Sequence, residues 1–255
     1  MTAFEPISRT ISFIEDSLRT TISVADMAEV AAYSLYHFCR VFGKFTRHTP
    51  YDYLMRRRMT LAAQDVVLTE RKIVDIAMDY QFESHEGFTR AFQRIMGAAP
   101  TQARRQRSIM ATRRLTRLTD AHLHYLQQQK GMIPTFTMLP NFSSGRVAFW
   151  ARFDGKGCPC NNLSLQPGEI AQITIPPTWP ALDDSGVASS VGTDGEYARF
   201  SLTEKMADLP LALDWILHAW LFYAPYQLRQ SEVLIQREEP GHLHLYVPVQ
   251  RDQEH

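Results

Sequence analysis

Arg40 and Arg90 are the residues whose type and spacing point most directly to a chemistry. A guanidinium group can donate two parallel hydrogen bonds to the edge of a guanine, or it can bind a phosphate. The two arginines lie 50 residues apart, and each stands two positions after a phenylalanine. A single surface arginine is most often only a solvated charge, but the matched placement of this pair favours binding to a polyanion.

The sequence around each arginine is a repeat. Each copy contains, in order, an Asp-x-Ala triplet, an aromatic residue, a serine, the pattern Phe-x-Arg-x-Phe and a proline, over residues 26–50 and 75–100. Matching positions are 49 apart before Glu83 and 50 apart after it, which indicates a one-residue insertion in a turn. A two-helix unit that occurs twice, with a basic residue on its second helix, predicts two helix-turn-helix reading heads.

The helices that must position these arginines can be predicted from the spacing of apolar residues. Ser23, Ser34 and Ser84 stand where helix N-caps are expected. The linking helix would span about 27 Å, which is close to the roughly 34 Å between successive major-groove faces of one duplex, so no dimer is needed. The predicted helices of the first hundred residues are 6–19, 24–31, 35–46, 51–68, 73–79 and 84–95.

The formal net charge of zero hides a difference between the two halves of the chain. Residues 1–115 carry 17 Lys and Arg against 12 Asp and Glu, whereas residues 116–255 carry 10 against 15. The first half therefore suits a polyanion, and the second half would repel one.

Cysteine usage and hydropathy exclude several classes of protein. Three cysteines are too few for the disulfide framework of a secreted domain, and the spacing of Cys158 and Cys160 is not that of a zinc or redox motif. No signal stretch or apolar run of membrane-spanning length occurs. We expect a cytoplasmic protein without metal, cofactor or membrane contact.

From residue 133 the sequence changes to short β-like runs separated by Gly, Pro and Asp. One aromatic-rich helix is expected around Trp215, and residues 108–130 are expected to form a connecting helix. Aromatic side chains of this half would either line an apolar pocket or form an ordinary core. They are Trp150, Trp215, Trp220 and Tyr223. The predicted strands are 135–138, 146–152, 170–175, 197–202 and 243–249.

Residues 33–42 and 73–100 resemble the two reading heads of AraC/XylS-type transcription regulators, and the resemblance covers residues 6–107. It implies that the chain binds double-stranded DNA at promoter sites, contacts RNA polymerase and acts as an activator. It also implies which residues lie against the bases or phosphates. These are Tyr36, Cys39, Arg40 and Lys44 in the first head, and His85, Glu86, Thr89 and Arg90 in the second.

The chain departs from the family at the turn of each head. Glycine is frequent there, but Ala32 and Gln81 occupy the two positions. Because a residue with a Cβ rarely adopts a positive φ, we expect no glycine-like backbone angle at either position.

The second half resembles, more weakly, the GyrI-like effector domains of multidrug-sensing regulators, through residues 195–200 and 245–249. The resemblance implies that Glu232 lies in an aromatic-lined cleft and attracts a small cationic, lipophilic effector, which charge and cation–π contact would both favour. Residues 155–194 contain no helical run, so the domain is expected to be shortened.

Together these observations predict an α+β protein of two domains. An all-α tandem helix-turn-helix domain occupies residues 1–107, a linker 108–132, and a GyrI-like α+β domain 133–255. We expect a sequence-specific transcription regulator and not an enzyme, since no catalytic triad stands out. The alternatives left open are a second half that acts through protein contacts, or one that hydrolyses small molecules.

Overall fold

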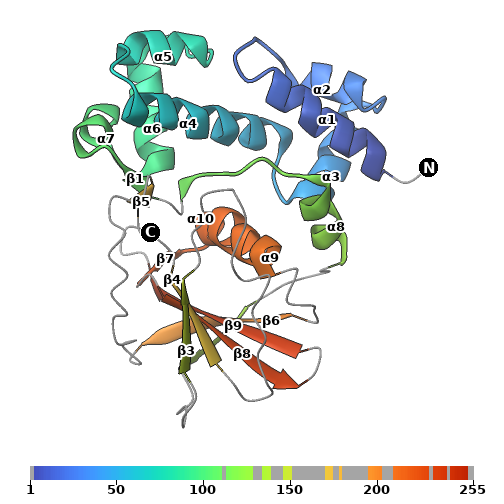
Figure 1. The fold of residues 1–255 in the computed structure, drawn as a ribbon. Coiled ribbons are helices and arrows are strands. Elements are labelled where there is room, and N and C mark those ends of the chain that lie inside the picture. Colours follow the sequence, from blue (N-terminus) through green and yellow to red (C-terminus); the bar gives the residue numbers. More distant parts are fainter. Residues whose placement is uncertain are drawn as a thin grey trace. The chain divides into compact units, whose positions relative to one another are not determined.

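The computed structural model shows a chain of two compact units (Figure 1). The first comprises Met1–Gln128 and Thr178–Leu182, and the second comprises Gln129–Pro177 and Asp183–His255. The structure describes residues 3–110, 113–128, 134–138, 146–150, 170–174, 178–179, 195–202, 209–229, 232–239 and 242–251.

The first unit is built from helices. A long helix, α4, runs through it, with α1 to α3 around one end and α5 to α7 around the other (Figure 1). We call α2 and α3 the first head, and α5 and α6 the second head. The six predicted helices are confirmed, with their ends shifted by three residues or fewer. The helices are α1 (Phe4–Asp16), α2 (Val24–Val30), α3 (Leu35–Thr46), α4 (Pro50–Leu68), α5 (Ile73–Asp79), α6 (His85–Met96), α7 (Pro100–Gln106) and α8 (Asp120–Gln128).

Local hydrogen bonds explain where these helices begin. The Ser23 hydroxyl accepts from the backbone N–H of Asp26, whose carboxylate accepts in return from the Ser23 N–H at 2.7 Å. These bonds lower the pKa of Asp26. Ser34 and Ser84 cap α3 and α6 in a similar way, so the three predicted caps are confirmed.

Phenylalanines form the inner face of each head. Phe38 and Phe42 on α3 are fully buried, as are Phe88 and Phe92 on α6. Because residues four apart share one side of a helix, their burial turns the opposite side of each second helix outward.

Helix α4 carries three consecutive arginines, Arg56, Arg57 and Arg58, and all three are buried. Arg57 makes a bidentate ion pair with Glu15, with Nε–Oε1 and Nη2–Oε2 distances of 2.8 Å. Arg58 donates to the backbone carbonyls of Leu18 and Thr20. Arg57 and Arg58 therefore hold α4 against α1 and the α1–α2 connection.

The predicted connecting helix over residues 108–130 is wrong except for α8. Ile109–Met110 forms strand β1, which pairs with β5 (Thr178–Trp179), and the described residues 114–119 before α8 are not helical. The Leu115 N–H donates to Thr60 Oγ1 and the Leu118 N–H to the Tyr53 hydroxyl. Because α4 supplies these backbone partners, the leucines pack without the helix that their spacing suggested.

The second unit contains an α+β arrangement. Its described strands form a sheet in the order β2-β6-β9-β8-β4-β3, in which β3 and β4 are parallel and the other neighbours antiparallel, and β7 pairs with β9. The strands are β2 (Thr135–Met138), β3 (Arg146–Trp150), β4 (Ile170–Thr174), β6 (Glu196–Leu202), β7 (Tyr226–Leu228), β8 (Glu232–Glu239) and β9 (His242–Arg251). The helical segment consists of α9 (Leu209–Trp215), a π-helical turn (Ile216–Trp220) and α10 (Leu221–Tyr223).

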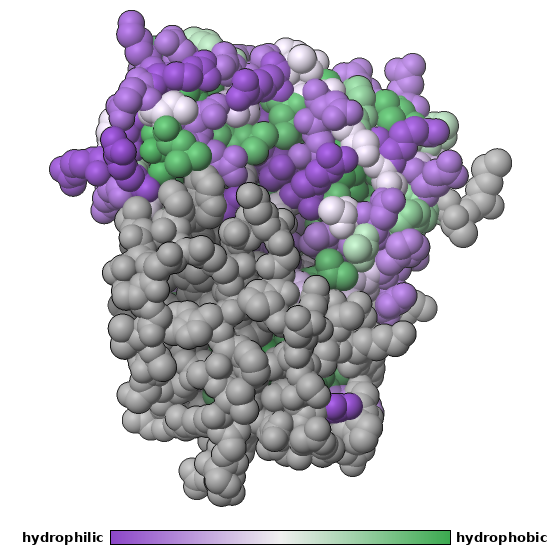
Figure 2. Space-filling view, in the orientation of Figure 1, coloured by the Kyte–Doolittle hydropathy of each residue, from purple (hydrophilic) through white to green (hydrophobic). Residues whose placement is uncertain are grey.

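The five predicted strands and the aromatic helix are confirmed, whereas β7 and β8 were not predicted. Strand β8 ends in Arg237, Glu238 and Glu239, and such charged residues interrupt the apolar alternation that marks a strand. Figure 2 shows that the coloured helical surface is mostly hydrophilic on this face, with small apolar patches. None of the described helices has the length and hydropathy needed to cross a membrane.

Candidate nucleic-acid interface

Helix α3 presents the predicted residues of the first head to solvent. Tyr36 is 73% exposed, and Cys39, Arg40 and Lys44 are exposed as well. The guanidinium carbon of Arg40 lies 5.7 Å from the centre of the Tyr36 ring. This cation–π contact restrains the Arg40 side chain on the outer side of α3.

Helix α6 presents His85, Glu86 and Arg90 in the same way. Thr89 differs, because it is only partly exposed and its hydroxyl oxygen is enclosed, with no hydrogen-bond partner among the described residues. Arg94, which is not among the predicted contact residues, is also exposed. It stands 50 residues after Lys44, so the repeat contained the signal that would have identified it.

The expectation about the turn of each head is wrong. Ala32 has a φ of 56° and Gln81 a φ of 66°, so both lie in the left-handed region. Each ends its helix with a closing hydrogen bond on the next residue, from the Tyr33 N–H to the Ala28 carbonyl and from the Phe82 N–H to the Ala77 carbonyl. This C-terminal motif requires a positive φ, which costs a residue with a Cβ about 1–2 kcal/mol.

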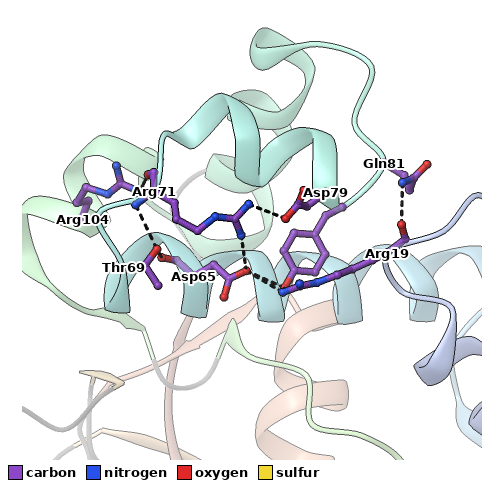
Figure 3. A network of polar contacts seen from close by, with 8 residues as sticks. Arg19, Asp65, Thr69, Arg71, Asp79, Gln81 and Arg104 are labelled. Carbon is purple, nitrogen blue, oxygen red and sulfur yellow. Dashed lines mark hydrogen bonds and ion pairs between the residues drawn. The ribbon is translucent and has the colours of Figure 1, made fainter.

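A polar network joins the α1–α2 connection, which leads into the first head, to α4 and to the turn of the second head (Figure 3). We call it the bridge. Arg19, in the α1–α2 connection, places Nη2 at 3.1 Å from Asp65 Oδ2 on α4 and at 3.0 Å from the Tyr80 hydroxyl after α5. The hydrogen bond to Tyr80 is the main cause that raises the pKa of Arg19. Gln81 donates to the Arg19 carbonyl at 2.8 Å and accepts from Thr21 at 2.7 Å.

The bridge continues into the second head through Arg71. Its guanidinium lies 2.6 Å from Asp79 and 3.8 Å from Asp65. Arg104 on α7 donates to the carbonyls of Val66 and Arg71, which secures the end of α4. Arg104 therefore serves an internal contact. The bridge thus fixes the α1–α2 connection and the second head to α4.

The second unit brings several aromatic rings together. Tyr226 stacks on Phe136 at 4.8 Å and on Trp220 at 6.4 Å, and Phe200 meets Trp220 edge-on at 4.9 Å. Phe136 and Tyr223 are exposed, while Trp215 and Trp220 are half-buried. Of the predicted effector residues, Trp150 and Glu232 have side chains that lie outside the described residues.

No group of three or more His, Cys, Asp and Glu side chains is arranged for a metal ion within the described ranges. Cys158 and Cys160 lie outside the described residues.

The known proteins that resemble this chain match residues of its first unit. A family model described as a helix-turn-helix domain matches residues 27–106. The transcriptional activator AarP of Providencia stuartii is 34% identical over 95 residues, which is 37% of this chain and 70% of AarP. The uncharacterised transcriptional regulator YbfP of Bacillus subtilis is 38% identical over 94 residues, which is 37% of this chain but only 32% of YbfP.

Among solved structures, the DNA-binding domain of AdpA in complex with a target DNA is similar to part of the chain. The TM-score is 0.38 and the sequence identity 22%, and the likeness covers 40% of this chain and 91% of that one.

Proposed function

Because the chain belongs to the AraC/XylS family of transcription regulators, we propose that it binds promoter DNA with both heads of the first unit. The observation that carries this proposal is the pair Arg40 and Arg90. Each is exposed on the second helix of its head, opposite a buried pair of phenylalanines. Residues 1–115 also have the positive charge surplus that a phosphate backbone attracts.

In this proposal α3 and α6 enter successive major grooves of one duplex. Helix α4 has 19 residues and spans about 28 Å, which fits heads that face grooves roughly 34 Å apart. Arg40 and Arg90 donate to guanine edges or phosphates, and Lys44 and Arg94 lie one turn further along to bind phosphates. Glu86 accepts from a cytosine amino group in the second head.

We further propose that the protein is an activator that contacts RNA polymerase in the cytoplasm. The support is the likeness to AarP, which is named a transcriptional activator, together with the position of both heads in a single unit. A regulator that carries both heads on one chain can bind DNA as a monomer, which leaves the rest of its surface available to the polymerase.

For the second unit we propose a GyrI-like domain that binds a small cationic, lipophilic effector. The support is the stacked series Phe136, Tyr226 and Trp220, whose ring faces suit a planar cation. Glu232 begins β8 and supplies the negative charge. The alternatives are a unit that acts through protein contacts and a unit that hydrolyses small molecules.

Selection of bound DNA from a random pool tests the proposal for the first unit. The full chain should enrich a site with two conserved blocks about 10 base pairs apart, centre to centre. The Arg40→Ala and Arg90→Ala chains should each bind the enriched site about fivefold to 150-fold more weakly, since a bidentate contact to guanine is worth about 1–3 kcal/mol. Enrichment of no sequence, or of a single block, would reject the two-headed reading of DNA.

The proposal for the second unit is tested by thermal shift with lipophilic cations such as dyes. Binding to the native chain should raise its melting temperature, and Glu232→Gln should reduce that shift because it removes the charge while keeping the shape. A neutral dye of similar size should give the same shift with both chains. If no cation raises the melting temperature of the native chain, the effector proposal fails and the protein-contact alternative stands.

A further inference from the structure

Residues 113–128 follow both heads and lie beyond the segment 27–106 that the family model matches. We call them the strap. Leu115, Leu118 and Leu123 of the strap are 2%, 7% and 1% exposed. They belong to the same buried cluster as Phe38 and Phe42, the phenylalanines of the inner face of α3. The strap therefore completes the core on which the first head rests.

The strap is held to α4 by its backbone as well as by its leucines. The Tyr53 hydroxyl accepts from the Leu118 N–H at 3.2 Å and donates to Glu15 Oε1 at 2.9 Å. Arg57, the bidentate partner of Glu15, also donates to the Leu115 carbonyl. The Tyr53 and Arg57 side chains are buried. The Leu115 carbonyl and the Leu118 N–H would therefore lose these hydrogen-bond partners if the strap moved away from α4.

Helix α8, the end of the strap, packs against α1 and α3. The His124 ring stacks on Phe4 with centroids 4.1 Å apart, and the Asp120 carboxylate accepts from Ser8 at 2.5 Å. Two longer contacts reach the end of α3, from Gln127 Nε2 to the Lys44 carbonyl at 3.4 Å and from Arg47 Nη2 to the Leu126 carbonyl at 3.5 Å.

The two heads differ at the residue that ends the second helix. In the first head this residue is Arg47, with a φ of 63°, and in the second head it is Gly97, with a φ of 79°. Glycine adopts this angle without strain, whereas arginine does not. The strained arginine is the one whose side chain extends to α8, so the end of α3 is adapted to the strap in a way that the end of α6 is not.

We propose that the strap is a positioning element for the first head, which sets the orientation of α3 and thereby of Arg40. It holds α3 from its inner face through leucines and from its C-terminal end through α8. The strap ends at Gln128, and the second unit begins at Gln129. The role of α3 in reading DNA rests on the proposed function, but the restraint on α3 does not.

The test uses three variants of the full chain. Leu118→Ala removes a leucine of the strap, and Tyr53→Phe removes the hydroxyl that accepts from the Leu118 N–H and donates to Glu15. Leu68→Ala is the matched control, because Leu68 lies on the same unit but is 62% exposed. Amide hydrogen exchange is measured for peptides of α3 and α6, and footprints are taken on the selected DNA site.

Leu118→Ala and Tyr53→Phe should each raise the amide exchange rate in α3 about tenfold relative to α6. A tenfold rise corresponds to the loss of about 1.4 kcal/mol of local stability, the size expected for one lost contact. Footprints should then weaken at the half-site of the first head alone, and Leu68→Ala should change neither measurement. Equal changes in α3 and α6 in both variants, or no change in either helix, would overturn the proposal. A native chain that leaves no footprint would reject the DNA-binding proposal, while the exchange data would still decide the role of the strap.

Discussion

Arg40 and Arg90 occupy equivalent positions but have different neighbours. Tyr36 precedes Arg40 by four residues and lies under its guanidinium, whereas Glu86 precedes Arg90 by four residues. An aromatic ring restrains an arginine without neutralising it, while a carboxylate reduces the local attraction for phosphate. The two heads should therefore read different bases, and the second should depend less on the phosphate backbone.

The repeat in the sequence was sufficient to predict that Arg40 and Arg90 occupy equivalent positions on two helices, because a residue that recurs 50 positions later on the same helical face is seldom a coincidence. The left-handed angles at Ala32 and Gln81 could not be predicted in this way. Their conformation is set by closing hydrogen bonds of the preceding helix, and neither residue has an intrinsic preference for a positive φ.

Ala32→Gly should stabilise the first unit by about 1 kcal/mol, because glycine removes the left-handed strain at this position. Gln81→Gly relieves the same strain but also removes the hydrogen bonds to Thr21 and Arg19, so it should give no gain. Urea unfolding of the two variants measures the difference. A less stable Ala32→Gly chain would show that the strain at this turn is smaller than the flexibility that glycine adds to the unfolded state.

At the scale of helices and their connections, the spacing of apolar residues predicted each helix of the two heads, since each helix buries one row of apolar side chains. The part of the strap before α8 was assigned wrongly because its backbone partners come from Thr60 and Tyr53, which are distant in sequence. The bridge was not predicted for a similar reason. Nothing in the local sequence of Arg19 indicates that Asp65 and Tyr80 will surround it.

The bridge should fix the spacing at which the two heads engage DNA. Asp65→Asn weakens the contacts with Arg19 and Arg71 together, so the variant should discriminate less between the selected site and one with an extra base pair between its blocks. The dissociation constant for the lengthened site divided by that for the selected site should fall by about threefold to tenfold relative to the native chain. Asp79→Asn is the control, because it removes only the contact of Asp79 with Arg71 at the second head and leaves the contact of Arg19 with Asp65 in place. Equal ratios in all three chains would show that the bridge does not set the spacing.

His48, which lies two residues before α4, should make the first unit sensitive to acid. Burial is the main cause that lowers the pKa of His48, and Arg56 lowers it further, although Asp52 at 3.1 Å opposes both. The unfolded chain then takes up this proton first, so the free energy of unfolding should fall as the pH drops below about 6.5. The slope from one such group is at most about 1.4 kcal/mol per pH unit.

His48→Gln removes the titrating group, so the pH dependence of its unfolding between about pH 5 and 6.5 should be flatter than that of the native chain. Urea unfolding across this range measures both slopes. Identical slopes would mean that His48 does not titrate differently in the folded and unfolded chain.

Considered as a whole, the molecule separates its charges between the two halves of the chain. A net charge of zero would by itself argue against nucleic acid, yet the surplus of basic residues before residue 116 matches the unit that carries both heads. The fold class of the second half could be predicted from its short strands. Its aromatic stack could not, because Phe136, Phe200 and Tyr226 come from separate strands that only the folded sheet brings together.

The most direct test of two-headed reading is a hydroxyl-radical footprint on the selected site with the native chain, Arg40→Ala and Arg90→Ala. The native chain should protect two stretches about one helical turn apart. Arg40→Ala should lose protection in one stretch and Arg90→Ala in the other, while circular dichroism shows both variants folded. Variants that both keep the full native footprint, or that both lose the same single stretch, would contradict the assignment of one arginine to each groove.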